Sequence, residues 1–305
     1  MQLAQHERSA QRRRQRLHGA LDRTTDAVDD QFLTIFSTLI TQNRFPDLIA
    51  LQSNIEQVSF LRLIGALAML DVLPLGAPDG VPDLDVAAPW AYLGVSYGAH
   101  NGIGLLPFAP EIHAAALAVG GGRWSATLVH QEGGSVGAAG LYDFVADFYP
   151  ELRRSEFYVG LALAQMAIDD QDWLNRAHLL YRDPLGLGAS PSVLLTEGLH
   201  DNWIPPYSTQ TAAHELGIPQ LAPVMPVFFL ESAENPVQGN VHGMATAALF
   251  QFVPSGVEGL APSPGCESET EGHYCAPRAA NAIAQRLRFF ESALDGIPEI
   301  IDATP

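Results

Sequence analysis

The chain has 305 residues, of which 47% are hydrophobic, so it can bury a sizeable core as one large domain or two ordinary ones. Its formal net charge is −18, although only 16% of the residues are charged. An acidic protein of this kind is not expected to have nucleic acid or an anionic membrane as its main partner. No apolar stretch approaches the roughly 20 residues that a membrane-spanning helix needs.

Residues 1–23 are expected to form a basic tail. All the basic residues of the chain are arginines, and several crowd this end: Arg8, Arg12, Arg13, Arg14 and Arg16. Such a cluster would suit nucleic acid or lipid headgroups, but we favour a solvated, poorly ordered tail. The same stretch lacks an apolar region, so no signal peptide is visible.

The rest of the chain, 24–305, is expected to form one α/β domain. Apolar residues at three- and four-residue spacing predict helix within residues 24–70, and LPLGAPDGVPDLD at 73–85 predicts a loop. Nearly all-apolar runs predict four strands, at 87–94, 114–122, 192–198 and 222–231. Further helices are predicted at 98–108, within 139–183, at 210–217 and at 281–294. Apolar strands that alternate with helices predict a mostly parallel sheet flanked by helices on both faces.

A Gly-x-Ser-x-Gly pattern occurs twice, at Gly94–Gly98 and at Gly133–Gly137. In a nucleophile elbow the serine stands on a tight turn between a buried strand and a helix. Ser96 has this context, because the apolar run of the first strand continues to Val95. The residues before Ser135 are polar, so we interpret Ser135 as part of a loop. Ser96 is therefore the candidate nucleophile.

A serine nucleophile needs a histidine base and a carboxylate that orients the histidine. The third predicted strand ends in EGLHDNWIPP, which offers Asp201, with Glu197 as the second choice of acid. The fourth predicted strand is followed by GNVHG, which offers His242. The order serine, acid, histidine along the chain is that of a hydrolase triad.

At these three motifs, GVSYG, EGLHDNWIPP and GNVHG, the chain resembles the α/β-hydrolase superfamily, in particular its lipase- and esterase-like members. The resemblance covers roughly residues 45–255. It implies a Ser96, Asp201 and His242 triad, with the Tyr97 backbone N–H as an oxyanion donor. It also implies hydrolysis of a small-molecule carboxylic ester through an acyl-enzyme, without a cofactor. The apolar and aromatic residues at 142–173 favour an apolar acyl group. The helical insertion at 123–190 falls where the family often has a lid.

The sequence departs from this family before the elbow, where the family has further strands. Nothing before residue 86 has the pattern of a buried strand, so we expect a fold that is N-terminally incomplete, through truncation or as a minimal variant. The loop with the second oxyanion donor would then be missing, and a sheet edge would be open to association between copies. A non-catalytic module that binds ligands or partners is the alternative function.

The two cysteines, Cys266 and Cys275, lie nine residues apart in a polar stretch. No second pair of Cys or His has zinc spacing, so no metal site is expected. A disulfide is favoured over two free thiols, and it would indicate a secreted or cell-envelope protein.

Overall fold

The computed structural model describes residues 49–72, 78–125, 127, 142–143, 145–147 and 149–302. The basic tail expected at 1–23 lies outside the described residues, and so does Ser135. Neither prediction is tested by the structure.

One parallel sheet organises the described chain. Its strands, in spatial order, are β1 (Trp90–Val95), β2 (Ile112–Ala118), β3 (Ser192–Gly198), β7 (Ala247–Phe252), β4 (Gln220–Leu221) and β5 (Ser232–Ala233). Every pairing in this sheet is parallel. The short strands β6 (Val237–Gln238) and β8 (Glu299–Ile300) form a separate antiparallel pair. The expected fold class, a mostly parallel α/β sheet, is confirmed.

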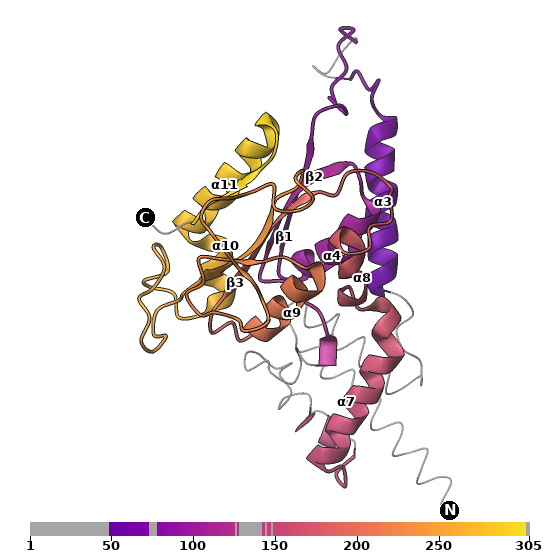
Figure 1. Cartoon of the computed structure of the whole chain (residues 1–305). Coiled ribbons are helices and arrows are strands. Elements are labelled where there is room, and N and C mark those ends of the chain that lie inside the picture. Colours follow the sequence, from indigo (N-terminus) through magenta and orange to yellow (C-terminus); the bar gives the residue numbers. More distant parts are fainter. Residues whose placement is uncertain are drawn as a thin grey trace, which may run out of the picture.

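Helices cover both faces of the sheet (Figure 1). One face carries α3 (Ile49–Ala66), α4 (Tyr97–Leu105), α8 (Leu174–Tyr181) and α9 (Pro206–Leu216), with the short 3₁₀ turns η1 (Leu106–Phe108) and η2 (Asp169–Gln171). The other face carries α10 (Gly272–Arg278) and α11 (Ala280–Asp295). All seven residues of β3 are buried, as expected for an apolar strand between two helical layers.

The two faces of the sheet have separate hydrophobic clusters. Trp173 and Leu195 belong to the cluster under α4, α8 and α9. Phe250 and Phe289 belong to the cluster between the sheet and α11. Because side chains alternate along a strand, a single strand contributes to both clusters.

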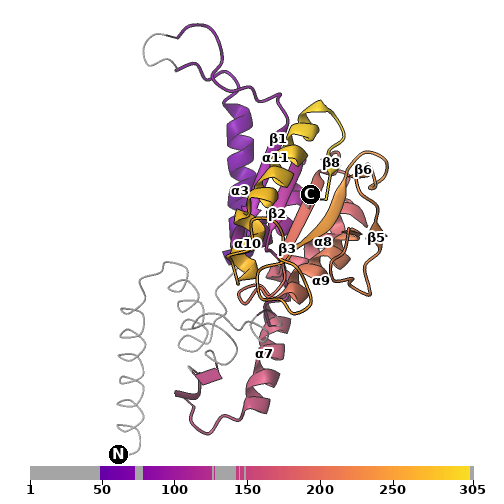
Figure 2. The same cartoon turned by 90° about the vertical axis from the view of Figure 1, so that its left-hand side faces the viewer.

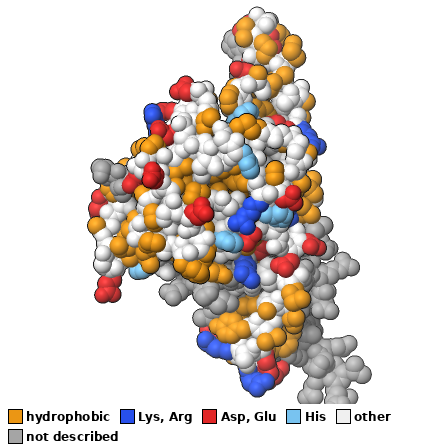
Figure 3. Space-filling model, viewed as in Figure 1, with side chains coloured by type: hydrophobic (Ala, Val, Ile, Leu, Met, Phe, Trp, Pro, Cys, Tyr) orange, Lys and Arg blue, Asp and Glu red, His pale blue; other side chains and the backbone are white. Residues whose placement is uncertain are grey.

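The insertion expected at 123–190 divides into two parts in the described chain. Helix α8 belongs to the core, since Trp173 at its N-cap is completely buried. Helix α7 (Arg154–Ile168) instead extends away from the sheet (Figures 1 and 2). Its surface carries hydrophobic side chains (Figure 3), with Val159, Leu163 and Met166 more than half exposed. A lid function of this helix remains a prediction.

The strand predicted at 222–231 is not formed. This stretch is a loop between the two-residue strands β4 and β5, and Phe228 in it is 96% exposed. Pro223 and Pro226 have no N–H to donate to a neighbouring strand, so an apolar sequence here does not produce a strand. The fourth long strand of the sheet is β7, further along the chain.

Strand β1 lies at the edge of the sheet, and β2 is its only partner among the strands that the structure describes. Residues 49–72 and 78–89, the described part of the chain before β1, contain no strand. Leu93 and Val95 on this edge strand are 58% and 42% exposed. No helix in the described ranges is long and apolar enough to cross a membrane.

Candidate active site

Ser96 stands between the end of β1 and the start of α4 in a strained backbone conformation. Its φ is 55° and its ψ is −120°, values that residues other than glycine rarely adopt. Such a conformation costs about 1–3 kcal/mol and is found preferentially at functional sites. Its backbone N–H donates to Ala118 at the end of β2, and its carbonyl accepts from His100 in α4. Ser96 therefore has the local geometry of a nucleophile elbow.

The glycines on either side of Ser96 differ in what they require. A Cβ on Gly94 would lie 2.5 Å from the carbonyl oxygen of Gly98, so the tight turn excludes any larger residue at position 94. A Cβ on Gly98 would meet nothing within 4 Å. Tyr97 begins α4, and its backbone N–H has no acceptor among the described residues. The first N–H groups of a helix have no partner within the helix, and this one is available to an acceptor outside it.

Asp201 lies in the loop between β3 and α9, and its carboxylate is buried. One oxygen accepts from the backbone N–H groups of Trp203 at 2.8 Å and Ile204 at 2.7 Å. The same carboxylate accepts from the ring of His273, with Nδ1 at 2.9 and 3.1 Å from the two oxygens. Three donors therefore surround one buried carboxylate.

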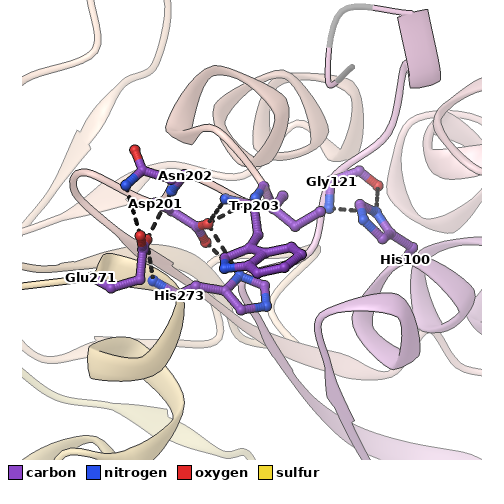
Figure 4. A network of polar contacts seen from close by, with 8 residues as sticks. His100, Gly121, Asp201, Asn202, Trp203, Glu271 and His273 are labelled. Atoms are coloured by element: carbon purple, nitrogen blue, oxygen red, sulfur yellow. Dashed lines mark hydrogen bonds and ion pairs between the residues drawn. The ribbon is translucent and has the colours of Figure 1, made fainter. Parts of the chain in front are cut away.

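His273 is the second residue of α10 and points toward Asp201 (Figure 4). Its exposed fraction is 9%. Because the Asp201 carboxylate can only accept hydrogen bonds, Nδ1 of His273 carries the proton. In the neutral ring Nε2 is then unprotonated and carries a lone pair. This is the tautomer that a general base requires. The ring of Trp203 lies beside the imidazole, with 6.2 Å between ring centroids.

The structure does not bring His242 to Asp201, so the predicted pairing of these two residues is corrected to Asp201 and His273. His242 precedes β7, and its Nε2 lies 3.2 Å from the carbonyl oxygen of Tyr181. Asp201 follows the other end of the neighbouring strand, β3. A six-residue strand spans about 20 Å, and this length separates the two ends of the sheet.

The sequence does not point to His273, because the stretch at 222–231 has the composition of a buried strand although it forms a loop. A catalytic histidine is expected after the last long strand, and this stretch therefore directs the prediction to His242. With β7 as that strand, the next histidine along the chain is His273. The apolar run ALFQF at 248–252 was the signal that could have found it.

Ser96, Asp201 and His273 all lie on the side of the sheet where the parallel strands end, but among the described residues only Asp201 and His273 are joined by a hydrogen bond. Ser96 follows β1, and Asp201 follows β3, with β2 between these two strands. Backbone hydrogen bonds between neighbouring segments continue past the ends of the strands: the N–H of Ser96 donates to the carbonyl of Ala118, and the N–H of Val119 donates to the carbonyl of Thr196. His273 reaches the same side from the segment after β7.

His100 is a second buried histidine near the site, four residues after Ser96. Its Nδ1 lies 2.8 Å from the nitrogen and 2.5 Å from the oxygen of Gly121, and its Nε2 has no partner among the described residues. The ring stacks on Trp173. Burial lowers the pKa of His100 to about 4, so the ring is neutral at physiological pH.

Glu197, the second choice of acid, does not contact a histidine. Its Oε1 accepts from the side-chain amides of Gln251 at 2.7 Å and Gln210 at 3.2 Å. Its other oxygen is buried without a partner in the described chain. Burial raises the pKa of Glu197 to about 7, so the group holds its proton over much of the acidic range.

Cys266 and Cys275 form a disulfide, as expected from the sequence. Both cysteines are buried, and the bond closes the loop that carries His273. The part of the chain that the structure describes contains no cluster of three or more His, Cys, Asp or Glu side chains that could hold a metal.

The site combines a strained serine at a strand–helix elbow with a buried acid–histidine pair at the carboxyl edge of a parallel sheet. The architecture of the described chain is a parallel sheet of six strands with helices on both faces. No protein-family model matches the sequence, and neither does any curated protein.

Three solved structures are similar in part. A puromycin-hydrolysing peptidase of Mycobacterium tuberculosis shares 16% identity, with 67% of this chain and 22% of that chain covered and a TM-score of 0.36. Acetyl xylan esterase 1 of Thermoanaerobacterium sp. shares 13%, with 66% and 47% covered and a TM-score of 0.33. A protein described as a non-haem bromoperoxidase, from M. tuberculosis H37Rv, shares 16%, with 83% and 78% covered and a TM-score of 0.37.

This chain spans less than half the length of the first two of these proteins. With such low identities and TM-scores, the substrates of these proteins say nothing about the substrate of this chain.

Proposed function

We propose that the protein is a serine hydrolase of carboxylic esters, with Ser96 as nucleophile, His273 as general base and acid, and Asp201 as the residue that orients His273. The buried hydrogen bond between Asp201 and His273 carries this proposal, because it holds the histidine in the tautomer of a base. The strained backbone of Ser96 at the same edge of the sheet supports it.

The reaction follows from these roles. Ser96 Oγ attacks the carbonyl carbon of the ester while its proton passes to Nε2 of His273. The electron pair of the carbonyl π bond moves to the oxygen, and the backbone N–H of Tyr97 stabilises the negative charge that forms there by a hydrogen bond. When this electron pair re-forms the carbonyl double bond, the bond between the carbonyl carbon and the alcohol oxygen breaks. His273 donates its proton to the alcohol oxygen as it leaves. Water then attacks the acyl-serine in the same way and releases the acid.

Asp201 stabilises the charged imidazole that forms during each step. Its own charge is held by the backbone N–H groups of Trp203 and Ile204. His100, which is neutral, adds no competing positive charge next to His273.

The backbone N–H of Tyr97 is the oxyanion donor of the proposed mechanism, because it stands at the start of α4 and has no acceptor among the described residues. A donor of this kind typically contributes a factor of about 10²–10³ to kcat.

Aromatic side chains around the site support an apolar substrate. Trp203 lies beside His273, and Tyr97 packs edge-on against Trp173 at a centroid distance of 5.4 Å. Tyr97 remains 37% exposed, so its ring can contact a bound acyl group. We expect esters with hydrophobic acyl groups to react faster than acetates.

Labelling with a fluorophosphonate tests the proposal. The probe should modify the wild-type chain at Ser96 alone, and Ser96→Ala and His273→Ala should abolish labelling. His242→Ala is the matched control and should label at the wild-type rate. Loss of labelling in His242→Ala, or labelling that survives in His273→Ala, would contradict the assigned base. A folded wild-type chain that is not labelled at all would indicate a non-catalytic binding module instead.

A further inference from the structure

The acid and the base of the candidate site come from distant parts of the chain. Asp201 and His273 are 72 residues apart, on the loop after β3 and on α10. Helix α10 has only seven residues, and Pro277 lies inside it. Such a short helix is not expected to hold a fixed position by itself. Other contacts must therefore fix His273 against the Asp201 loop.

Backbone contact provides the first of these. Gly272 donates its N–H to the carbonyl of His200 at 3.2 Å, next to Asp201. A Cβ on Gly272 would lie 2.2 Å from the carbonyl oxygen of Leu199, so the two backbones are in direct contact. This contact brings the two segments together, but it involves neither the Asp201 nor the His273 side chain.

The Glu271 carboxylate provides a second, more specific connection (Figure 4). Its Oε1 accepts from the backbone N–H of Asn202 at 2.8 Å, and its Oε2 accepts from the Asn202 side-chain amide at 2.7 Å. Oε1 also accepts from the backbone N–H of His273 at 3.3 Å, as the N-cap of α10. One carboxylate thus binds both the residue after Asp201 and His273 itself.

The chemistry of these contacts makes them strong and directional. Hydrogen bonds to a carboxylate are roughly twice as strong as those between neutral groups. Glu271 is partly buried, and its partners are N–H groups rather than a flexible cation. The negative charge at the first turn of α10 also interacts favourably with the helix dipole.

We propose that Glu271 is a positioning residue, which holds His273 at hydrogen-bond distance from Asp201 by joining the acid loop to the start of α10. Glu271 does not reach the reacting atoms. Its effect on catalysis rests on the proposed function, since it acts through the general base. Its effect on the geometry of the Asp201–His273 pair does not depend on that function.

Replacement of Glu271 tests the proposal. Glu271→Ala removes all three contacts. We expect His273 to move by about 1 Å as a result, and such a displacement should lower kcat by about 100-fold with little change in KM. Glu271→Gln retains an acceptor at Oε1, and a flipped Asn202 amide accepts from its new NH₂ group. This conservative variant should therefore recover most of the lost kcat. Glu267→Ala removes an exposed carboxylate from the same disulfide-closed loop and is the matched control.

A spectroscopic measurement separates geometry from activity. In the wild-type protein the Nδ1 proton of His273, bound to Asp201, should give a strongly downfield proton resonance, and His273→Ala assigns it. Glu271→Ala should broaden or lose this resonance, while Glu271→Gln and Glu267→Ala retain it.

The outcomes distinguish the two proposals. An unchanged resonance and unchanged kcat in Glu271→Ala would overturn the positioning role, and so would an equal loss in Glu271→Gln. Loss of the resonance in a folded Glu271→Ala, with no labelling of the wild type, would retain the positioning role and reject the hydrolase. If Glu271→Ala does not fold, Asn202→Ala removes the side-chain bond alone and should weaken the resonance; no change there would also overturn the proposal.

Discussion

Gly198, at the end of β3, lies with its backbone directly against the backbone of Gly272, at the start of α10. A Cβ on Gly198 would come within 2.0 Å of the carbonyl oxygen of Gly272, a distance that no real structure tolerates. Any side chain at either position must therefore push α10 away from the sheet. Because α10 carries His273, this contact between two glycines links the packing of the fold to the geometry of the candidate site.

Gly198→Ala should destabilise the protein and impair the site together. Overpacking of this kind typically costs about 1–3 kcal/mol, and the displaced α10 should slow fluorophosphonate labelling of Ser96. Gly160→Ala in α7 is the control, because a Cβ there meets nothing within 4 Å. Chemical denaturation and labelling rates measure both effects. A Gly198→Ala protein with wild-type stability and labelling would show that the contact is not needed.

Removal of the disulfide should affect both stability and activity. A loop closed over nine residues stabilises the folded protein by about 2–3 kcal/mol, by restricting the unfolded chain. The double variant Cys266→Ala, Cys275→Ala should lose about this free energy of unfolding. It should also label more slowly, because the loop that carries His273 is no longer closed. Equal denaturation midpoints for the two proteins would contradict the predicted contribution.

Glu197 should make the stability of the protein depend on pH. Burial raises its pKa in the folded state from 4.5 to about 7, so the folded protein holds this proton more tightly than the unfolded chain does. The stability that Glu197 contributes is thus complete below pH 4.5 and is lost as the pH rises to about 7. The whole change is about 3 kcal/mol, at 1.36 kcal/mol for each pH unit.

Glu197→Gln imitates the protonated acid and is the variant that tests this prediction. It should match the wild type in free energy of unfolding at pH 4 and exceed it at pH 8. Urea denaturation at both pH values measures the difference. If the free energy of unfolding changed with pH in the same way for the wild type and for Glu197→Gln, Glu197 would not be the source of the pH dependence.

The open edge of the sheet should promote association between copies. Among the described strands β1 pairs with β2 only, it contains no charged residue, and Leu93 and Val95 on it are exposed. Unprotected edges of this kind tend to pair with other strands. Leu93→Lys should shift the protein toward monomer in light scattering over a range of concentrations. Val159→Lys, on the distant α7, is the control, and a wild-type protein that stays monomeric throughout would contradict the prediction.

The sequence by itself determined the features that depend on neighbouring residues. The strand at 192–198 and the last helix follow from local apolar patterns, and the structure has them at Ser192–Gly198 and Ala280–Asp295. The turn at Ser96 follows from a strand that runs into Gly-x-Ser-x-Gly. The disulfide between Cys266 and Cys275 follows from two cysteines close together in one polar stretch.

Only the tertiary structure decided which histidine meets Asp201. The stretch at 222–231 and the strand β7 are both apolar, and composition does not distinguish a proline-interrupted loop from a strand in the sheet. Pairing with β3 makes that distinction, since β7 has a strand partner and the loop does not. All strands of a parallel sheet end on the same side. His273 follows β7 and therefore lies on the side where β3 ends and the loop with Asp201 begins, whereas His242 precedes β7 and lies on the opposite side.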